Sequence, residues 1–250
     1  MKIFVVKRKW IAAMVCLMLC AIGLTYAGRS VSVSGGQAKE VPIYSVETEE
    51  AKIALTFDCA WNDNDIDSIL DTLDKYQCKA TFFLVGDWIE RFPESVKKLY
   101  DRGHEIGNHS YNHGHYNSMS EQQIHADMDK CDKMIEEITG VKPTLFRAPY
   151  GEYNNTVIRA CKSSGREYIQ WNVDSLDWKD IPPADIFRRS TTKIKNGDIL
   201  LLHNGTKYTA EALPDVLAEL TKRFSLVKVS DLIYHDGYTI DAEGTQKREK

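Results

Sequence analysis

The stretch from Ile53 to Trp61 reads Ile-Ala-Leu-Thr-Phe-Asp-Cys-Ala-Trp, an apolar run that ends in the acid Asp58. A short apolar run of this kind predicts a buried strand, which would carry Asp58 to the end of a sheet. In parallel α/β sheets the catalytic groups lie at the ends of the strands, where the loops open to solvent. Asp58 is therefore a candidate catalytic group.

Two histidines, His109 and His113, follow a later predicted strand at a spacing of four residues. If this segment is helical, both imidazoles share one face of the helix. Neutral imidazoles bind zinc, nickel, cobalt or iron(II), so the pair is a candidate metal site. Two surface histidines in a polar loop would give the same pattern.

Further polar groups also follow predicted strands. Arg147 begins the turn Arg-Ala-Pro-Tyr-Gly, and an arginine there can hold a carboxylate by a bidentate contact. Asp177 precedes Trp178, and an acid beside a large aromatic ring suits a sugar site. His203 ends an apolar run, and its ordinary pKa makes it a proton donor or acceptor near neutrality. Taken singly, each is equally explained by a salt bridge, a helix cap or a buried histidine.

Alternating strands and helices must position these groups. Apolar patterning predicts about seven strands, at residues 53–57, 80–85, 104–107, 144–147, 168–173, 198–202 and 226–229. Helices are predicted between them, at residues 66–73, 88–100, 120–138, 154–164, 183–195 and 210–223. This alternation implies a parallel α/β sheet, either an open doubly wound sheet or a closed or incomplete barrel. Polar chemistry after nearly every strand favours the barrel, whose strand ends share one mouth.

Composition excludes some classes of function. The chain has 250 residues and a formal net charge of -4, so it offers no electrostatic support for nucleic-acid binding. It contains neither G-x-G-x-x-G nor G-x-x-x-x-G-K-S/T, so nucleotide binding lacks its usual sequence support. The absence of C-x-x-C argues against a zinc–thiolate cluster. Export would permit disulfides, but the spacing does not require them, among Cys59, Cys78, Cys131 and Cys161.

The N-terminal segment predicts export. Lys7-Arg8-Lys9 precedes an uncharged run from Trp10 to Ala27. A basic flank before an apolar stretch is typical of a signal peptide, and about 18 apolar residues also suffice for a spanning helix. The basic residues lie on the N-terminal side, which predicts an extracytoplasmic location for the rest. We expect a signal peptide or signal-anchor helix at 1–27, a flexible tether at 28–50, a catalytic domain at 51–235 and a polar C-terminal tail at 236–250.

Five motifs in order resemble the polysaccharide deacetylases of carbohydrate esterase family 4. They are Thr-Phe-Asp58, His109-Ser-x-x-His113, Arg147-x-Pro-Tyr150, Asp174-x-x-Asp177-Trp178 and Leu201-x-His203. The resemblance covers about residues 52–234. It implies a distorted or incomplete (β/α) barrel of about seven parallel strands. It also implies a metal-dependent hydrolase that removes acetyl groups from N-acetylated sugars. Because the domain is predicted to be exported, peptidoglycan is the first candidate polymer and chitin-type oligomers are the second.

The resemblance also implies roles for individual residues. Asp58 would be the general base and Arg147 would orient it. His203 would protonate the leaving amine, held in its charged form by Asp177. The backbone at Tyr150 would help to bind the oxyanion. Three residues are implied to contact the substrate, namely Trp178, Leu201 and Pro149. Two are implied to bind a divalent metal ion, zinc or cobalt, namely His109 and His113.

One position departs from the family pattern. Cys59 stands where the family has a second acid that completes the metal ligands. Asp65 or Asp63 would supply the missing oxygen from the loop after Trp61, although either acid would also be explained as a helix cap. Alternatively, Cys59 itself would bind the metal as a thiolate. The third explanation is weak or absent metal binding, in a slow enzyme or a non-catalytic glycan-binding domain of the cell wall.

Overall fold

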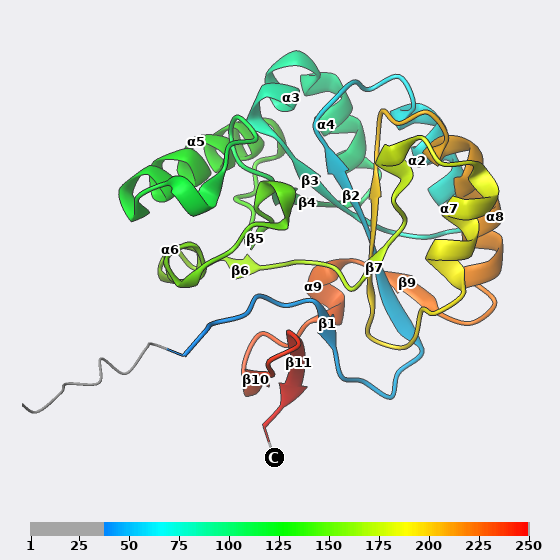
Figure 1. Ribbon diagram of the computed structural model, residues 1–250. Coiled ribbons are helices and arrows are strands. Elements are labelled where there is room, and N and C mark those ends of the chain that lie inside the picture. The colour runs from blue at the N-terminus through cyan, green and yellow to red at the C-terminus, as the bar shows by residue number, and fades with distance from the viewer. Residues whose placement is uncertain (1–37, 250) are drawn as a thin grey trace, which may run out of the picture. The chain divides into compact units, whose positions relative to one another are not determined.

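The computed structural model describes residues 38–249. Within the compact unit that begins at Lys39, strands and helices alternate along the chain (Figure 1). The strands are β1 (Ser45–Val46), β2 (Lys52–Cys59), β3 (Thr81–Leu84), β4 (Glu105–Asn108), β5 (Leu145–Phe146), β6 (Glu167–Tyr168), β7 (Val173–Asp174), β8 (Ile199–His203), β9 (Ser225–Val227), β10 (Tyr238–Ile240) and β11 (Thr245–Arg248). The α-helices are α2 (Ile66–Lys75), α3 (Gly86–Arg91), α4 (Pro93–Asp101), α5 (Glu121–Thr139), α6 (Asn155–Ser163), α7 (Pro183–Thr191), α8 (Thr209–Leu220) and α9 (Val229–Leu232).

The central sheet is parallel and incomplete as a barrel. Its strand order is β6-β5-β4-β3-β2-β8-β7, and β9 pairs with the first part of β2. Strands β6 and β7 follow one another in the chain but lie at opposite ends of this order, so the barrel is open between them. Ile43 bridges to Ile169, and Ser45 bridges to Asp198, at this opening. The predicted α/β fold with an incomplete (β/α) barrel is therefore confirmed.

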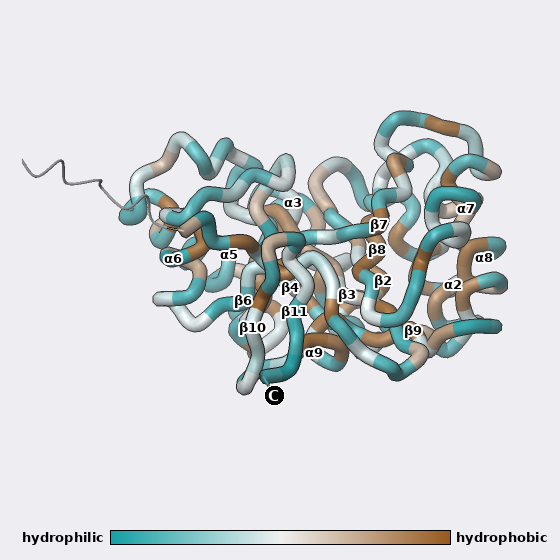
Figure 2. Tube along the Cα trace, turned by 60° about the horizontal axis from the view of Figure 1, so that its bottom comes forward, coloured by the Kyte–Doolittle hydropathy of each residue, from teal (hydrophilic) through white to brown (hydrophobic). Residues whose placement is uncertain are grey.

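Strand β2 separates two hydrophobic layers. Its alternate residues Ile53, Leu55, Phe57 and Cys59 are fully buried in the large cluster shared with the helices. Ala54 belongs instead to the cluster inside the barrel. Because neighbouring side chains on a strand point to opposite faces, Asp58 points inward like Ala54. Figure 2 shows the apolar character of the central strands and the polar loops around them.

Two helices, α5 and α6, begin at residues whose side chains cap them. Helix α5 starts after Ser120, whose side chain and that of Gln123 form a capping box. It ends at Gly140, whose φ of 74° is in the left-handed region that glycine readily adopts. Helix α6 starts after Asn154, whose side chain accepts a hydrogen bond from the Val157 amide.

Two predicted elements are divided in the structure. The helix predicted at 88–100 is split into α3 and α4, because Pro93 cannot continue the hydrogen bonding of α3 and begins α4 instead. The strand predicted at 168–173 is split into β6 and β7, because the intervening residues cross the opening of the barrel.

The segments that flank the barrel also differ from expectation. Strand β1 lies in the predicted tether, and β10 and β11 lie in the predicted polar tail. Together they form a second sheet, in which β11 pairs parallel to β1 and antiparallel to β10. These strands were not predicted because their residues are mostly polar. One of these polar residues, Gln246, is nevertheless fully buried.

The predicted signal peptide or signal-anchor helix at 1–27 lies outside the described residues. Within residues 38–249, no helix is long and apolar enough to cross a membrane.

Candidate active site

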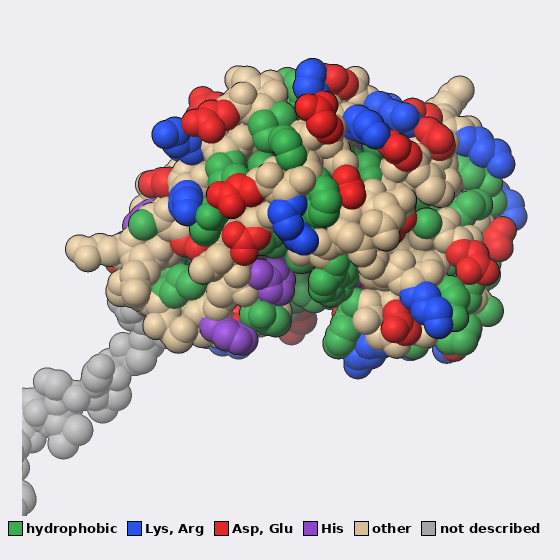
Figure 3. Space-filling view, turned by 90° about the horizontal axis from the view of Figure 1, so that it is seen from above, with side chains coloured by type: hydrophobic (Ala, Val, Ile, Leu, Met, Phe, Trp, Pro, Cys, Tyr) green, Lys and Arg blue, Asp and Glu red, His purple; other side chains and the backbone are tan. Residues whose placement is uncertain are grey.

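The strand ends that carry the predicted motifs surround one cavity. It has a volume of about 400 Å³. Figure 3 looks down on the face toward which β2 points, where histidine side chains lie at the surface beside a notch. The lining residues are Asp58, Ala60, Trp61, His109, His113, Tyr150, Trp171, Asp174, Trp178, Leu201 and His203. We call this space the active cavity.

Arg147 holds Asp58 in place. The Arg147 guanidinium is fully buried, and its Nη1 donates to Asp58 Oδ1 at 2.7 Å and to Thr56 Oγ1 at 3.0 Å. It also lies over the Phe83 ring, 4.1 Å from the ring centroid. Burial raises the pKa of Asp58. The charge of Arg147, with smaller contributions from His109 and His203, lowers it by more than burial raises it, so the pKa is below its ordinary value. Asp58 is therefore an ionised carboxylate inside the barrel.

The neighbouring histidine has a defined orientation. His109 Nδ1 lies 2.8 Å from the carbonyl oxygen of Arg147. A carbonyl can only accept, so Nδ1 carries a proton and the Nε2 of neutral His109 presents its lone pair. Nε2 lies 3.5 Å from Asp58 Oδ2. Burial is the largest effect on the pKa of His109 and lowers it, which favours the neutral ring that can bind a metal.

His113 reaches the same place through a loop rather than a helix. Ser110 and His113 have φ angles of 73° and 56°, which no α-helix contains. The Ser110 hydroxyl accepts a hydrogen bond from the His113 amide at 2.9 Å. The rings of His109 and His113 pack edge to face, with centroids 5.2 Å apart. Burial, followed by the charge of His109, lowers the pKa of His113 to about 4.

His203 is paired with a buried acid. Asp177 is fully buried, and its Oδ1 lies 2.8 Å from His203 Nδ1. Asp177 Oδ2 accepts from the His203 amide at 2.7 Å and from Thr209 Oγ1 at 2.6 Å. Burial lowers the pKa of His203, but the hydrogen bond and charge of Asp177 raise it more, so the net direction is upward. His203 is thus favoured as a protonated imidazolium.

The three residues considered for a third metal ligand, Asp63, Asp65 and Cys59, are each engaged elsewhere. Asp63 Oδ2 accepts from Ser95 Oγ at 2.7 Å. Both oxygens of Asp65 accept from the Gly205 amide, at 2.9 and 2.8 Å. Cys59 is fully buried in the layer beneath the helices, and burial raises the pKa of its thiol well above the ordinary value.

The expectation that one of these three residues completes the metal site is therefore not met. Among residues 38–249, no cluster of three or more His, Cys, Asp or Glu side chains is placed to hold a metal ion. His109 and His113 fit two positions of a metal site, and within residues 38–249 the acid nearest to His109 is Asp58, the residue assigned as the base.

The residues expected to contact substrate divide into two groups. Trp178 and Leu201 line the active cavity, with Trp178 47% exposed. Tyr150 also lines it, in a left-handed backbone conformation with φ of 60°, and its ring stacks on His115 at 4.4 Å between centroids. Pro149 differs from expectation because it is buried in the turn and does not line the cavity.

Sequence reasoning missed two tryptophans of the active cavity. Trp61 is 45% exposed and its ring lies 5.5 Å from that of His203. Trp171 donates from Nε1 to Asp174 Oδ2 at 3.3 Å. The position of Trp61 three residues after Asp58 was the only available signal. Trp171 fell inside a predicted strand and gave none.

The four cysteines within residues 38–249 are all buried, and none of them forms a disulfide. They are Cys59, Cys78, Cys131 and Cys161.

Comparison with known proteins agrees with this arrangement. The sequence profile of the polysaccharide deacetylase family matches residues 45–169. A peptidoglycan-N-acetylglucosamine deacetylase of Bacillus cereus is 34% identical over 196 residues, which cover 76% of this chain and 92% of that protein. The uncharacterized protein YlxY of Bacillus subtilis is 34% identical over 211 residues, 84% of this chain and 66% of that protein.

A solved structure of similar shape comes from Bacillus anthracis. BA3943, described as a pseudoenzyme of the CE4 family, has a TM-score of 0.74 and 32% identity over 77% of this chain and 68% of that one. The present chain also spans only 40% of the Bacillus subtilis peptidoglycan-N-acetylmuramic acid deacetylase PdaC, to which it is 33% identical.

The structure is an incomplete parallel (β/α) barrel with a paired carboxylate and a paired histidine at its mouth. With the profile and the relatives, it follows that this chain belongs to the polysaccharide deacetylase family.

Proposed function

We propose that this chain removes acetyl groups from the N-acetylated sugars of a polysaccharide, with peptidoglycan as the substrate. One observation carries the proposal. Asp58 and His203 are paired across strands β2 and β8 and line the same cavity, one held as a carboxylate by Arg147 and the other kept protonated by Asp177. A base and an acid side by side are what amide hydrolysis requires.

The two groups would divide the proton transfers. Asp58 would accept a proton from the water that attacks the acetyl carbonyl carbon. The backbone N–H at Tyr150 would donate a hydrogen bond to the oxyanion that forms. His203 would then give its proton to the sugar nitrogen as the carbon–nitrogen bond breaks. The products are acetate and a free amine.

A divalent metal ion, zinc or cobalt, belongs to this proposal. His109 and His113 would hold it, and it would supply the Lewis acidity that polarises the acetyl carbonyl. Catalytic zinc usually has three protein ligands, and this site offers two. We therefore expect metal binding weaker than at a complete site.

The substrate and the location are proposed on different grounds. The Bacillus cereus relative is named for peptidoglycan. The basic and apolar N-terminal segment supports export, with the membrane contacted through that segment if it is retained.

The test is acetate release from peptidoglycan or N-acetylglucosamine oligomers, with and without added zinc or cobalt. We expect metal-dependent release that Asp58→Asn abolishes. No release from either polymer under any metal condition would contradict the proposal.

A second candidate is a non-catalytic or weakly active glycan-binding domain. It is favoured by the buried thiol at Cys59 and by the engagement of Asp65 with Gly205, which leave the histidine pair without the second acid of the family pattern. The similarity to a structure described as a pseudoenzyme points the same way. In this case the chain would bind glycan equally well in the presence of a chelator and release no acetate.

A further inference from the structure

A second groove lies along the free edge of β7, next to the active cavity. Its volume is about 460 Å³. Its lining residues, which define what we call the edge groove, are Asn172, Val173, Asp174, Arg188, Arg189, Thr192, Lys193, Lys195 and Asp198. Asp174 lines both the edge groove and the active cavity, so the two meet at this residue.

The edge groove is rich in cations, although the chain as a whole has a net charge of -4. Its two acids already have hydrogen-bond donors. Asp174 accepts from the Leu176 amide at 2.8 Å and from Trp171 Nε1 at 3.3 Å. Asp198 is 1% exposed and accepts from Asn172 Nδ2 at 2.6 Å and from the Lys195 amide at 2.8 Å.

Within residues 38–249, three of the four cations, in contrast, form no salt bridge. Burial raises the pKa of Asp198, and the charge of Lys195 acts on this acid in the opposite direction with a smaller effect. Arg188 pairs with Asp185 at 2.8 Å. In the part of the chain that the structure describes, Arg189, Lys193 and Lys195 take part in no ion pair. Positive charge in the edge groove is therefore available to a ligand.

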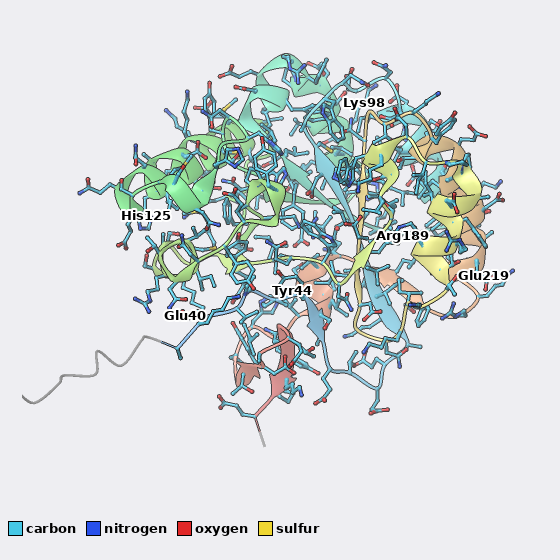
Figure 4. The ribbon with its side chains drawn as sticks, viewed as in Figure 1. Glu40, Tyr44, Lys98, His125, Arg189 and Glu219 are labelled. Carbon is cyan, nitrogen blue, oxygen red and sulfur yellow. The ribbon has the colours of Figure 1, made fainter. Side chains whose placement is uncertain are left out.

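Arg189 is the fixed point of this groove. Its Nε donates to the carbonyl oxygen of Asp174 at 3.1 Å, and the side chain is partly buried. Figure 4 shows Arg189 beside β7. A guanidinium held through Nε keeps its terminal nitrogens for a second partner, and its planar fork matches a carboxylate.

We propose that the edge groove binds a carboxylate carried by the sugar next to the one whose acetyl group occupies the active cavity. This proposal rests on the proposed function, because it places a glycan in the active cavity. A chain of sugars that continues past Asp174 enters the edge groove, where Arg189 forms the bidentate contact and Lys193 and Lys195 add positive charge. The edge groove would thus select anionic over neutral N-acetylated glycans.

The experiment compares two tetrasaccharides by titration calorimetry in the presence of a chelator, so that turnover is suppressed. One is a neutral N-acetylglucosamine tetramer. The other alternates N-acetylglucosamine with N-acetylmuramic acid and so carries lactyl carboxylates. We expect the carboxylated tetramer to bind about fivefold more tightly, the effect of two modest ion pairs.

The variants separate the edge groove from general charge effects. In Arg189→Gln/Lys193→Gln the preference should disappear while binding of the neutral tetramer stays unchanged. The matched control, Lys133→Gln/Lys222→Gln, removes two exposed lysines, one in α5 and one just after α8, and should keep the preference. Melting curves of both variants establish that each is folded.

Either of two results with the tetrasaccharides would overturn the proposal. One is equal binding of the two tetrasaccharides by the wild-type chain, including no binding of either. The other is a preference that survives in Arg189→Gln/Lys193→Gln. Inorganic phosphate serves as a competitor, and stronger competition by phosphate than by acetate would also overturn the assignment to a carboxylate. A chain that prefers the carboxylated tetramer but releases no acetate supports the edge groove while contradicting the deacetylase.

Discussion

Two acids set the charge of the active cavity at the level of single residues. Asp58 is kept ionised by the Arg147 guanidinium, and Asp177 keeps a proton on His203. Burial opposes charge on both Asp58 and His203, so each relies on its partner. Removing a partner should therefore change the protonation of the group that remains.

Asp177→Asn should make His203 lose its proton at a lower pH. Asp177 raises the pKa of His203, so the wild-type chain keeps its acid above the ordinary range of a histidine and loses it as pH rises through the raised pKa. In the variant, acetate release should begin to fall at a lower pH, with a rate at pH 7.5 reduced at least about tenfold. The pH profile of acetate release and the NMR titration of the His203 ring measure this. Asp180→Asn, in the same turn, is the control, and an unchanged titration of His203 would contradict the assignment.

Cys59 is a second position where one side chain decides the chemistry. Its thiol is fully buried next to the Asp58 and Asp65 carboxylates, which together with burial raise its pKa. A neutral thiol can be buried there at little cost, whereas an ionised carboxylate would be a buried charge without a partner. Asp58 can reach the cavity because neighbouring side chains on a strand point to opposite faces, and Asp58 points to the inside of the barrel.

Cys59→Asp should therefore link stability to zinc. With chelator present, we expect the variant to be destabilised by about 2–5 kcal/mol, the cost of a buried unpaired carboxylate. If the new acid turns toward His109 and His113, zinc should restore stability, by about 2.7 kcal/mol at a hundredfold excess over its dissociation constant. Urea unfolding with and without zinc measures both effects. Cys59→Ser should show no zinc dependence beyond that of the wild type, and a variant equally indifferent to zinc would show that this position cannot complete the metal site.

At the level of elements, the loops after β2 and β8 are tied together. Asp65 binds the Gly205 amide through both oxygens, and Asn62 Nδ2 donates to the Gly205 carbonyl at 3.3 Å. The Asn62 carbonyl in turn accepts from Trp88 Nε1 at 3.0 Å. These contacts hold Trp61 over His203, so the acid expected to bind a metal instead shapes the wall of the cavity.

Asp65→Asn should destabilise the chain without changing its affinity for zinc. The loss of a charge-assisted hydrogen bond to a backbone amide costs about 1–3 kcal/mol. Urea unfolding and a zinc titration by calorimetry test the two parts of the prediction. Asp67→Asn, on the exposed side of α2 and paired with Lys98, should lose well under 1 kcal/mol, as exposed ion pairs do. A large loss of zinc affinity in Asp65→Asn would return this residue to the metal site.

Local signals in the sequence were enough for most elements of the barrel and for the motif residues at their ends. Ser120 and Gly140 delimit α5 because capping depends on neighbours within one turn. The Asp65–Gly205 contact joins residues 140 positions apart, and no local rule predicts it. The positive φ angles of Ser110 and His113 were equally hidden, because the fold imposes them on residues that do not favour them. The two histidines were thus predicted as neighbours, but the backbone conformation that brings their rings together was not.

At the scale of the whole molecule, segments that precede and follow the barrel in the chain cover its open side. Ile43 and Ser45 bridge across it, and β1 is held by β11 from the C-terminal hairpin. Gln246 of β11 is fully buried and binds both the amide and the carbonyl of Tyr234, each at 2.7 Å. The sequence of this hairpin is polar because only part of one face is covered, and polarity alone suggested a frayed tail.

Deletion of residues 236–250 should consequently destabilise the chain while leaving the active cavity intact. The deletion exposes the Tyr234 backbone groups and removes the partner of β1, for a cost of about 2–4 kcal/mol. The active cavity is built at the opposite ends of the strands from β9 and α9, so acetate release, or glycan binding in chelator, should be unchanged at temperatures where the truncated chain is folded. Thermal melts and the activity assay at 25 °C measure the two effects. Gln246→Ala is the point control and should reproduce part of the loss, because it leaves the same backbone groups unpaired. If the truncated chain has the same melting temperature as the full chain, β1 closes the barrel without help from the hairpin.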